Sequence, residues 1–346
     1  MKLIVSGLVA IAAATGGVQA WDWSTASDEI SNSPEYASSK AVCRRLRDRE
    51  PPPADAPDKA TAATLKGCSS EALYYGIGVK ADPVRARQCA FLEAEAVRDD
   101  APFSGRTMLM IIYANGVGAR RDLDVATHLA CGIEGAAMES HGRVTHLAGL
   151  EAKGWKGSDF GFCDDVTSGL AMGYCASHDA DIQGAKRNSA LAALTHGWSA
   201  AERQAFEPLE KAHAAFVDAH GEGEVDLSGT ARAAIEIGEE QALRDELLAM
   251  LTALQNGRAP VFTAAQYRAA DAALNAGYRA FLASPDVGAD YAGAVSRDGV
   301  RAAQRAWLRY RDAFLAFAAV KYPHVPRDSL ATWITRKRSA MWKSGT

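Results

Sequence analysis

The sequence has few of the features that build β-sheets, metal sites or phosphate sites. Alternation of apolar and polar residues is scarce, whereas nearly every apolar pattern recurs at three and four residues, as in helices. There is no CxxC pair, no zinc-type histidine spacing, no Gly-rich phosphate loop and no nucleophile elbow. We therefore predict an all-α protein that is not an enzyme and carries no cofactor or metal. A hydrolase whose site has no known motif is the weaker alternative.

The first twenty residues predict export. Lys2 precedes the apolar run LIVSGLVAIAAAT, and small residues, Val18 and Ala20, occupy the two positions that a signal peptidase recognises. The run is shorter than the roughly 20 apolar residues needed to cross a bilayer, and no later run is long enough. We interpret residues 1–20 as a cleaved signal peptide, not a transmembrane anchor. A periplasmic or secreted location also makes nucleic acid an improbable partner.

The chain has an even number of cysteines, which in an oxidising compartment normally pair. We predict three disulfides and no metal site among Cys43, Cys68, Cys89, Cys131, Cys163 and Cys175.

From Thr61 the sequence repeats at a spacing of 40 residues, which is typical of stacked helix pairs. Glycines in the repeat permit the left-handed turn that ends one helix, an Asp can cap the next, and an Ala lets the two helices approach. The matched positions are Gly76 with Gly116, Gly78 with Gly118, Asp82 with Asp122, and Ala86 with Ala126.

This pattern resembles the Sel-one-like repeat, a relative of the tetratricopeptide repeat, over residues 61 to about 140. The second copy keeps the YxxGxGV feature as Tyr113, Gly116 and Gly118, while the first copy has Leu73 in place of the tyrosine. The resemblance implies either a small surface that binds a protein or peptide, or a purely structural clamp.

A Gly-rich segment, GWKGSDFGFCDDV, divides the chain. We expect residues 21–150 to hold an N-terminal helix and the repeats, and residues 160–346 to form a helical domain in two halves. The halves differ in charge: residues 160–259 carry 7 Lys and Arg against 16 Asp and Glu, and residues 260–346 carry 13 against 6.

The second part resembles the LprI-type lysozyme inhibitor domain of bacterial envelope proteins, with interruptions, from residue 163 to 342. The segments that carry the resemblance are AADAALNAGYRAFL, VRAAQRAWLRYRDAF and LATWITRKRSAMW. The matching residues, to which we assign structural roles, are Asp271, Leu274, Asn275, Tyr278, Gln304, Arg305, Ala306, Trp307, Tyr310, Arg311, Asp312, Thr335 and Arg336. The resemblance implies a protein partner in the envelope, such as a lysozyme or another muralytic enzyme.

The two resemblances also imply a disulfide pairing. The inhibitor family tends to begin with a cysteine pair spaced like Cys163 and Cys175, and cysteine-rich repeats bridge from the start of a repeat helix to the preceding helix. We therefore expect Cys43 to pair with Cys68, which leaves Cys89 for Cys131, and the other two connectivities of these four cysteines stay open.

Two groups of charged residues are candidates for binding. Because lysozymes are usually basic, an acidic turn containing Glu222, Glu224 and Asp226 is the expected inhibitor contact. A basic helix containing Arg301, Arg305 and Arg309 either packs on the acidic half, which we favour, or faces outward to an anionic cell-wall polymer or partner. Helical spacing predicts that Trp307 and Tyr310 are buried, and we expect Arg311 and Asp312 to tie helices together. The alternative function is a non-enzymatic structural adaptor in envelope maintenance that binds an endogenous protein or cell-wall polymer through the repeats.

Overall fold

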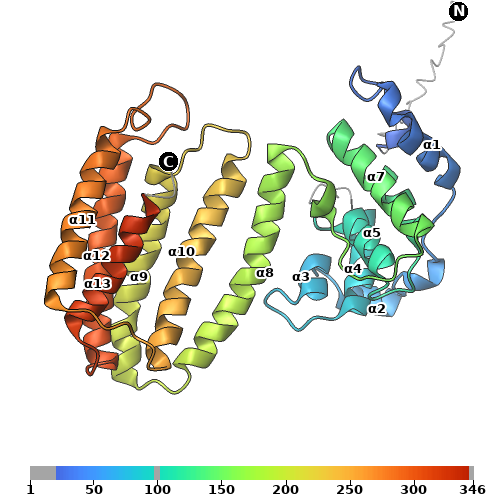
Figure 1. Cartoon of the computed structure of the whole chain (residues 1–346). Coiled ribbons are helices and arrows are strands. Elements are labelled where there is room, and N and C mark those ends of the chain that lie inside the picture. Colours follow the sequence, from blue (N-terminus) through green and yellow to red (C-terminus); the bar gives the residue numbers. More distant parts are fainter. Residues whose placement is uncertain (1–20, 97–101, 343–346) are drawn as a thin grey trace, which may run out of the picture.

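The computed structural model describes residues 21–96 and 102–342, and every regular element within them is helical (Figure 1). The all-α prediction is confirmed. The expected signal peptide, residues 1–20, lies outside the described residues.

Helices α1 to α7 form the first part of the fold, and apolar side chains from all of them except α2 share one hydrophobic core with Trp23. The helices are α1 (Ala37–Leu46), α2 (Lys59–Thr64), α3 (Ser70–Tyr75), α4 (Pro83–Glu95), α5 (Gly105–Asn115), α6 (Leu123–Cys131) and α7 (Ala137–Ala152). A short 3-10 helix, Phe162–Asp165, then leads to α8.

The pairs α3–α4 and α5–α6 have the same local geometry, 40 residues apart. Gly76 and Gly116 end α3 and α5 in the left-handed conformation, with φ of 76° and 65°. Asp82 and Asp122 cap α4 and α6 by accepting hydrogen bonds from backbone N–H groups three residues on. Ala86 and Ala126 are both fully buried where the helices meet. The periodicity in the sequence therefore corresponds to two equivalent helix pairs.

The disulfides are Cys43–Cys131, Cys68–Cys89 and Cys163–Cys175. The third agrees with the expectation, whereas the pairings Cys43–Cys68 and Cys89–Cys131 are wrong. Helix α1 packs against α6 and α7, not against the first helix pair, so Cys43 meets Cys131 at a Cα–Cα distance of 5.8 Å. Cys68 precedes α3, which packs on α4, the helix that carries Cys89.

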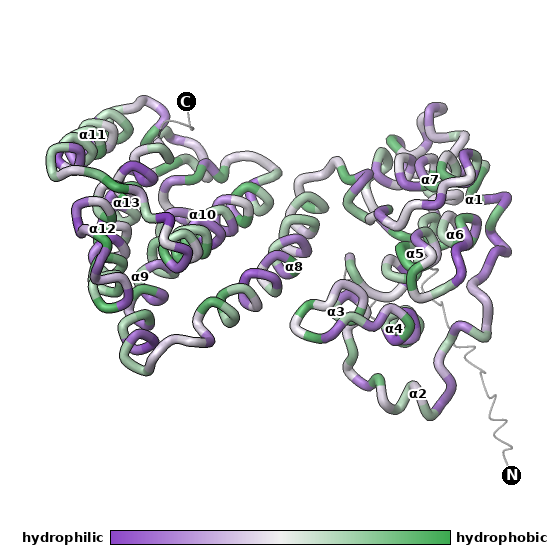
Figure 2. The backbone as a smooth tube through the Cα atoms, turned by 60° about the horizontal axis from the view of Figure 1, so that its bottom comes forward, coloured by the Kyte–Doolittle hydropathy of each residue, from purple (hydrophilic) through white to green (hydrophobic). Residues whose placement is uncertain are grey.

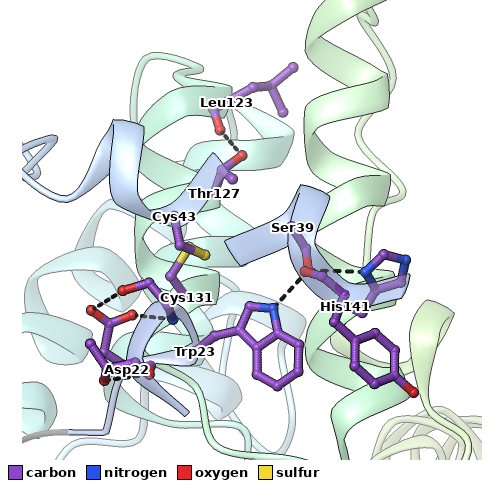
Figure 3. The surroundings of a disulfide bond; sticks show 11 residues. Asp22, Trp23, Ser39, Cys43, Leu123, Thr127, Cys131 and His141 are labelled. Atoms are coloured by element: carbon purple, nitrogen blue, oxygen red, sulfur yellow. Dashed lines mark hydrogen bonds between the residues drawn. A yellow bond between two sulfur atoms is a disulfide. The ribbon is translucent and has the colours of Figure 1, made fainter. Parts of the chain in front are cut away.

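A hydrogen-bonded cluster beside the Cys43–Cys131 bridge fixes the chain that follows residue 20 (Figure 3). The buried Trp23 donates its indole N–H to the Ser39 hydroxyl at 2.8 Å, and His141 Nδ1 lies 3.0 Å from the same oxygen. Because Ser39 is fully buried, this Ser–His contact has a structural role and offers no accessible nucleophile.

Helices α9 to α13 form a bundle around a second core, and α8 runs along its side toward the first part (Figures 1 and 2). The bounds are α8 (Gly169–Thr195), α9 (Ala200–Glu224), α10 (Arg232–Gln255), α11 (Ala264–Ala283), α12 (Arg297–Lys321) and α13 (Arg327–Met341). Helix α8 packs on α10, and α9 packs most extensively on α12.

The last turn of α9 crosses α12 at a contact between two glycines. A Cβ atom on Gly223 would lie 2.7 Å from the backbone of Gly299, and one on Gly299 would lie 2.7 Å from Gly223 Cα. Gly223 therefore allows two helices to touch, and it does not break α9. The expected acidic turn is wrong for this reason: Glu222 and Glu224 belong to the helix.

Candidate protein-binding site

Two loops meet at one end of the bundle, at the top in Figure 1: residues 225–231, between α9 and α10, and residues 284–296, between α11 and α12. We call them the paired loops. The Leu227 N–H donates to the Gly293 carbonyl at 2.8 Å, and the Tyr291 hydroxyl donates to Asp226 Oδ2 at 2.9 Å. Gly293 has a φ of 86°, and a Cβ there would lie 2.4 Å from the Leu227 backbone. A glycine is thus required where the loops cross.

Further contacts hold the paired loops in one conformation. Val287 is 2 % exposed and anchors the second loop, while Gly288 N–H donates to the Val295 carbonyl at 2.7 Å. Asp226 accepts from Ser228 N–H at 2.8 Å. Such preorganisation lowers the conformational entropy lost when a partner binds.

The paired loops carry exposed carboxylates and no basic residue, although the exposed Arg232 and Arg297 adjoin them. Hydrogen bonds from Ser228 and Tyr291 hold the pKa of Asp226 below its usual value, so that this carboxylate is ionised at neutral pH. The aromatic ring of Tyr291 is 47 % exposed beside it. Exposed acidic side chains on the loops and the adjoining turn of α9 are Glu222, Asp226, Asp286 and Asp290.

Glu224 does not belong to this surface, which corrects the expected acidic contact. Its side chain is only 2 % exposed and receives two hydrogen bonds from the fully buried Arg338 on α13, at 2.5 and 2.7 Å. Arg338 also donates to Gln304 on α12 at 3.1 Å. Glu224 is therefore part of the bundle interior and is unavailable to a partner.

His220 extends this buried ionic network. Its Nδ1 lies 2.9 Å from Glu224, and its Nε2 lies 3.5 Å from Glu239 on α10. Burial alone would lower the pKa of His220, but the two carboxylates outweigh burial and raise it. For Glu224, the effect of burial is likewise outweighed by His220 and Arg338, which lower its pKa. The network joins α9, α10, α12 and α13.

The opposite charges of the two halves are matched by residues other than the expected arginines. Arg301, Arg305 and Arg309 are all exposed, and Arg301 pairs with Asp298 on its own helix. The expectation that these three arginines pack on the acidic half is therefore wrong. Among the described residues, the ion pairs between the halves are Lys321–Glu202, Lys337–Glu246 and Arg338–Glu224.

The family-motif residues mostly build the bundle core. Trp307 and Tyr310 are 1 % and 4 % exposed, as predicted. Arg311 and Asp312, expected to tie helices together, instead bond to each other at 2.8 Å within α12, and Arg311 covers Trp307 on the same helix.

The remaining motif residues lie on α11, α12 and α13. Gln304, Leu274 and Thr335 are buried. Asn275 donates to Asp271, Tyr278 lies 5.7 Å from the Trp342 ring, and the Arg336 guanidinium covers Phe262 at 4.4 Å.

Sequence analysis missed Tyr291, His220 and Arg338. The two buried residues had a signal, because each falls at helical spacing on an apolar stripe, His220 four residues after Phe216 and Arg338 four before Trp342. Tyr291 had none, since its bond to Asp226 links positions 65 residues apart.

Within the described ranges, no cluster of three or more His, Cys, Asp or Glu side chains is arranged to hold a metal ion. None of the helices described here combines the length and apolarity needed to cross a membrane.

The geometry defines a disulfide-bonded helical protein with exposed carboxylates on two loops that hydrogen-bond to each other. Residues 249–332 match the family model described as Lysozyme inhibitor LprI. The matched stretch contains α11, the second of the paired loops and α12, together with the end of α10 and the start of α13. No curated protein and no solved structure matches the chain.

Proposed function

We propose that this chain is an exported protein that binds and inhibits a lysozyme-type enzyme of the cell envelope through the paired loops. The observation that carries the proposal is the match to the lysozyme inhibitor family, which spans the two helices and the loop that present Tyr291. Three disulfides favour an oxidising compartment, in the periplasm or outside the cell.

The charge of the surface supports this choice of partner. A basic enzyme is attracted by the exposed carboxylates of the paired loops, and opposite potentials accelerate association and favour the correct orientation. The exposed ring of Tyr291 supplies the rigid aromatic contact that often dominates binding energy at interfaces. The exposed Arg301, Arg305 and Arg309 repel a basic enzyme, so they lie outside the proposed contact.

The test is inhibition of peptidoglycan lysis by a lysozyme of high isoelectric point, using residues 21–346. We expect inhibition, and we expect the E222Q/D226N/D286N/D290N variant to require at least about tenfold more protein, a change of about 1.4 kcal/mol. The matched control D48N/E134Q/D181N/E207Q removes the same charge from exposed positions elsewhere and should inhibit like the parent. Equal effects of the two variants would show that net charge alone matters.

A second candidate is an envelope adaptor that binds a protein through the helix pairs. Val79 and Val84, at the turn between α3 and α4, are 50 % and 49 % exposed and give the first pair an apolar surface. If the adaptor hypothesis is correct, the parent does not inhibit lysozyme, and V79E/V84E abolishes cross-linking of the parent's envelope partner while the variant of the paired loops retains it. The opposite result supports the inhibitor.

A further inference from the structure

A cavity of about 250 Å³ lies between α8, α9 and α10. It exists because α8 packs along α10 and leaves a gap toward α9 near its C-terminal end. Its walls include Leu191, Phe206, Leu247 and Leu251. An apolar cavity with a few polar groups is the usual form of a small-molecule site.

Two arginines lie at this cavity, Arg187 on α8 and Arg244 on α10. Arg187 donates to Asp245 at 2.7 Å and to Gln241 at 2.5 Å, and Arg244 donates to Glu240 at 3.1 Å. A guanidinium has five N–H donors, so both side chains keep donors beyond these bonds. Arg187 is held firmly, since its side chain is only 12 % exposed.

His213 lines the cavity wall near the two arginines. Burial, followed by the charges of Arg244 and Arg187, lowers the pKa of His213 to about 4, although its hydrogen bond to the Leu243 carbonyl acts in the opposite direction. The imidazole is therefore neutral at neutral pH and does not add to the positive charge. One carboxylate, Glu210, also lines the cavity, and burial and then the nearby Glu207 raise its pKa.

We propose that the cavity binds a small carboxylate with an apolar chain, such as a medium-chain fatty acid. The carboxylate lies at Arg187 and Arg244, where charge-assisted hydrogen bonds recognise it. The chain packs against Phe206, Leu247 and Leu251. This site is separate from the paired loops and does not depend on the proposed inhibition.

The test is isothermal titration of octanoate into residues 21–346, with octylamine as the ligand of opposite charge. We expect one octanoate per chain and no binding of octylamine. R244Q should weaken octanoate binding by about tenfold, because a hydrogen bond to a charged group is lost. E210Q removes the carboxylate that lines the cavity itself, at a solvent-exposed position, and leaves Asp245 and Glu240 paired with the arginines, so it should strengthen octanoate binding.

A214F tests the location, since Ala214 is an exposed residue that lines the cavity and a phenyl ring there fills it. We expect A214F to abolish binding while its circular dichroism matches that of the parent. Three results would overturn the proposal: the parent does not bind octanoate, it binds octylamine equally well, or A214F and R244Q both bind octanoate with unchanged affinity. Should A214F misfold, the opposite effects expected for R244Q and E210Q decide the outcome.

Discussion

Glu224 and Arg338 form the most deeply buried ion pair between the two charged halves, with side chains 2 % and 0 % exposed. Removing one partner leaves a buried charge unpaired, which typically costs about 3 to 5 kcal/mol. We expect E224Q to lower the free energy of unfolding by an amount in this range, measured by urea denaturation. E222Q, two residues earlier on the exposed surface, is the control and should change stability by less than about 0.5 kcal/mol. Similar small effects for both variants would show that the pair contributes little.

Trp307 is the largest buried residue of α12. We expect W307A to destabilise the protein by about 3 to 5 kcal/mol, because truncation removes apolar contact and leaves a cavity. The control is L308A, because the adjacent Leu308 is 37 % exposed. This substitution should leave the free energy of unfolding nearly unchanged in the same denaturation experiment. A W307A protein as stable as the parent would contradict the packing described here.

His213 and His220 should give stability opposite dependences on pH. Burial lowers the pKa of His213 to about 4, so its contribution is present above the unfolded value of about 6.5 and is lost as pH falls toward 4. The pKa of His220 is raised, so its contribution is present below 6.5 and is lost as pH rises through the folded value.

Denaturation of the parent, H213Q and H220Q between pH 4 and 8 measures these contributions. H213Q should remove part of the acidic loss of stability, and H220Q should remove part of the loss on the alkaline side. Parallel pH profiles for all three proteins would refute the assignment.

The burial of an individual side chain could be predicted where the residue falls at helical spacing on an apolar face, as for Trp307 and Tyr310. Glu224 was misassigned because Gly221 and Gly223 resemble a helix break. The role of Gly223 depends on the neighbouring backbone of Gly299, a long-range contact that no local pattern encodes.

Among the elements, the disulfides differ in the length of chain that they close. Cys43–Cys131 joins residues 88 apart, and Cys163–Cys175 joins residues 12 apart. If loop entropy dominates, replacing both cysteines of Cys43–Cys131 by Ala should lower the free energy of unfolding by about 4 to 5 kcal/mol. The same replacement at Cys163–Cys175 should lower it by about 3 kcal/mol. Thermal denaturation ranks the two variants, and peptide mapping of the parent checks the pairing. Recovery of a Cys43–Cys68 peptide would contradict the position of α1.

The helix pairs were predictable because their signals are local: a glycine that ends one helix and an aspartate that caps the next. The position of α1 was not, since the Pro-rich segment after it leaves open which helix it packs against. The paired loops were also beyond prediction. Each loop is visible in the sequence, but the Leu227–Gly293 and Tyr291–Asp226 bonds that join them depend on the arrangement of the bundle.

At the scale of the whole molecule, the division near residues 150–160 stays a prediction, and α8 belongs to both cores. Cys175 lies in the first core, and His178 beside it stacks on Phe103 with ring centroids 3.8 Å apart. Leu191 and Leu194, later on α8, pack on the second core.

Because a single helix is shared between two cores, we expect the two cores to melt cooperatively. When the bundle unfolds, α8 loses its support from α10, and the first core then loses the turn that carries Cys175 and His178. We expect one heat-absorption peak in differential scanning calorimetry, with the calorimetric enthalpy equal to the van't Hoff enthalpy. Two resolved peaks would mean that α8 can fray in its middle and leave each core intact, in which case the chain would behave as two independent thermodynamic units.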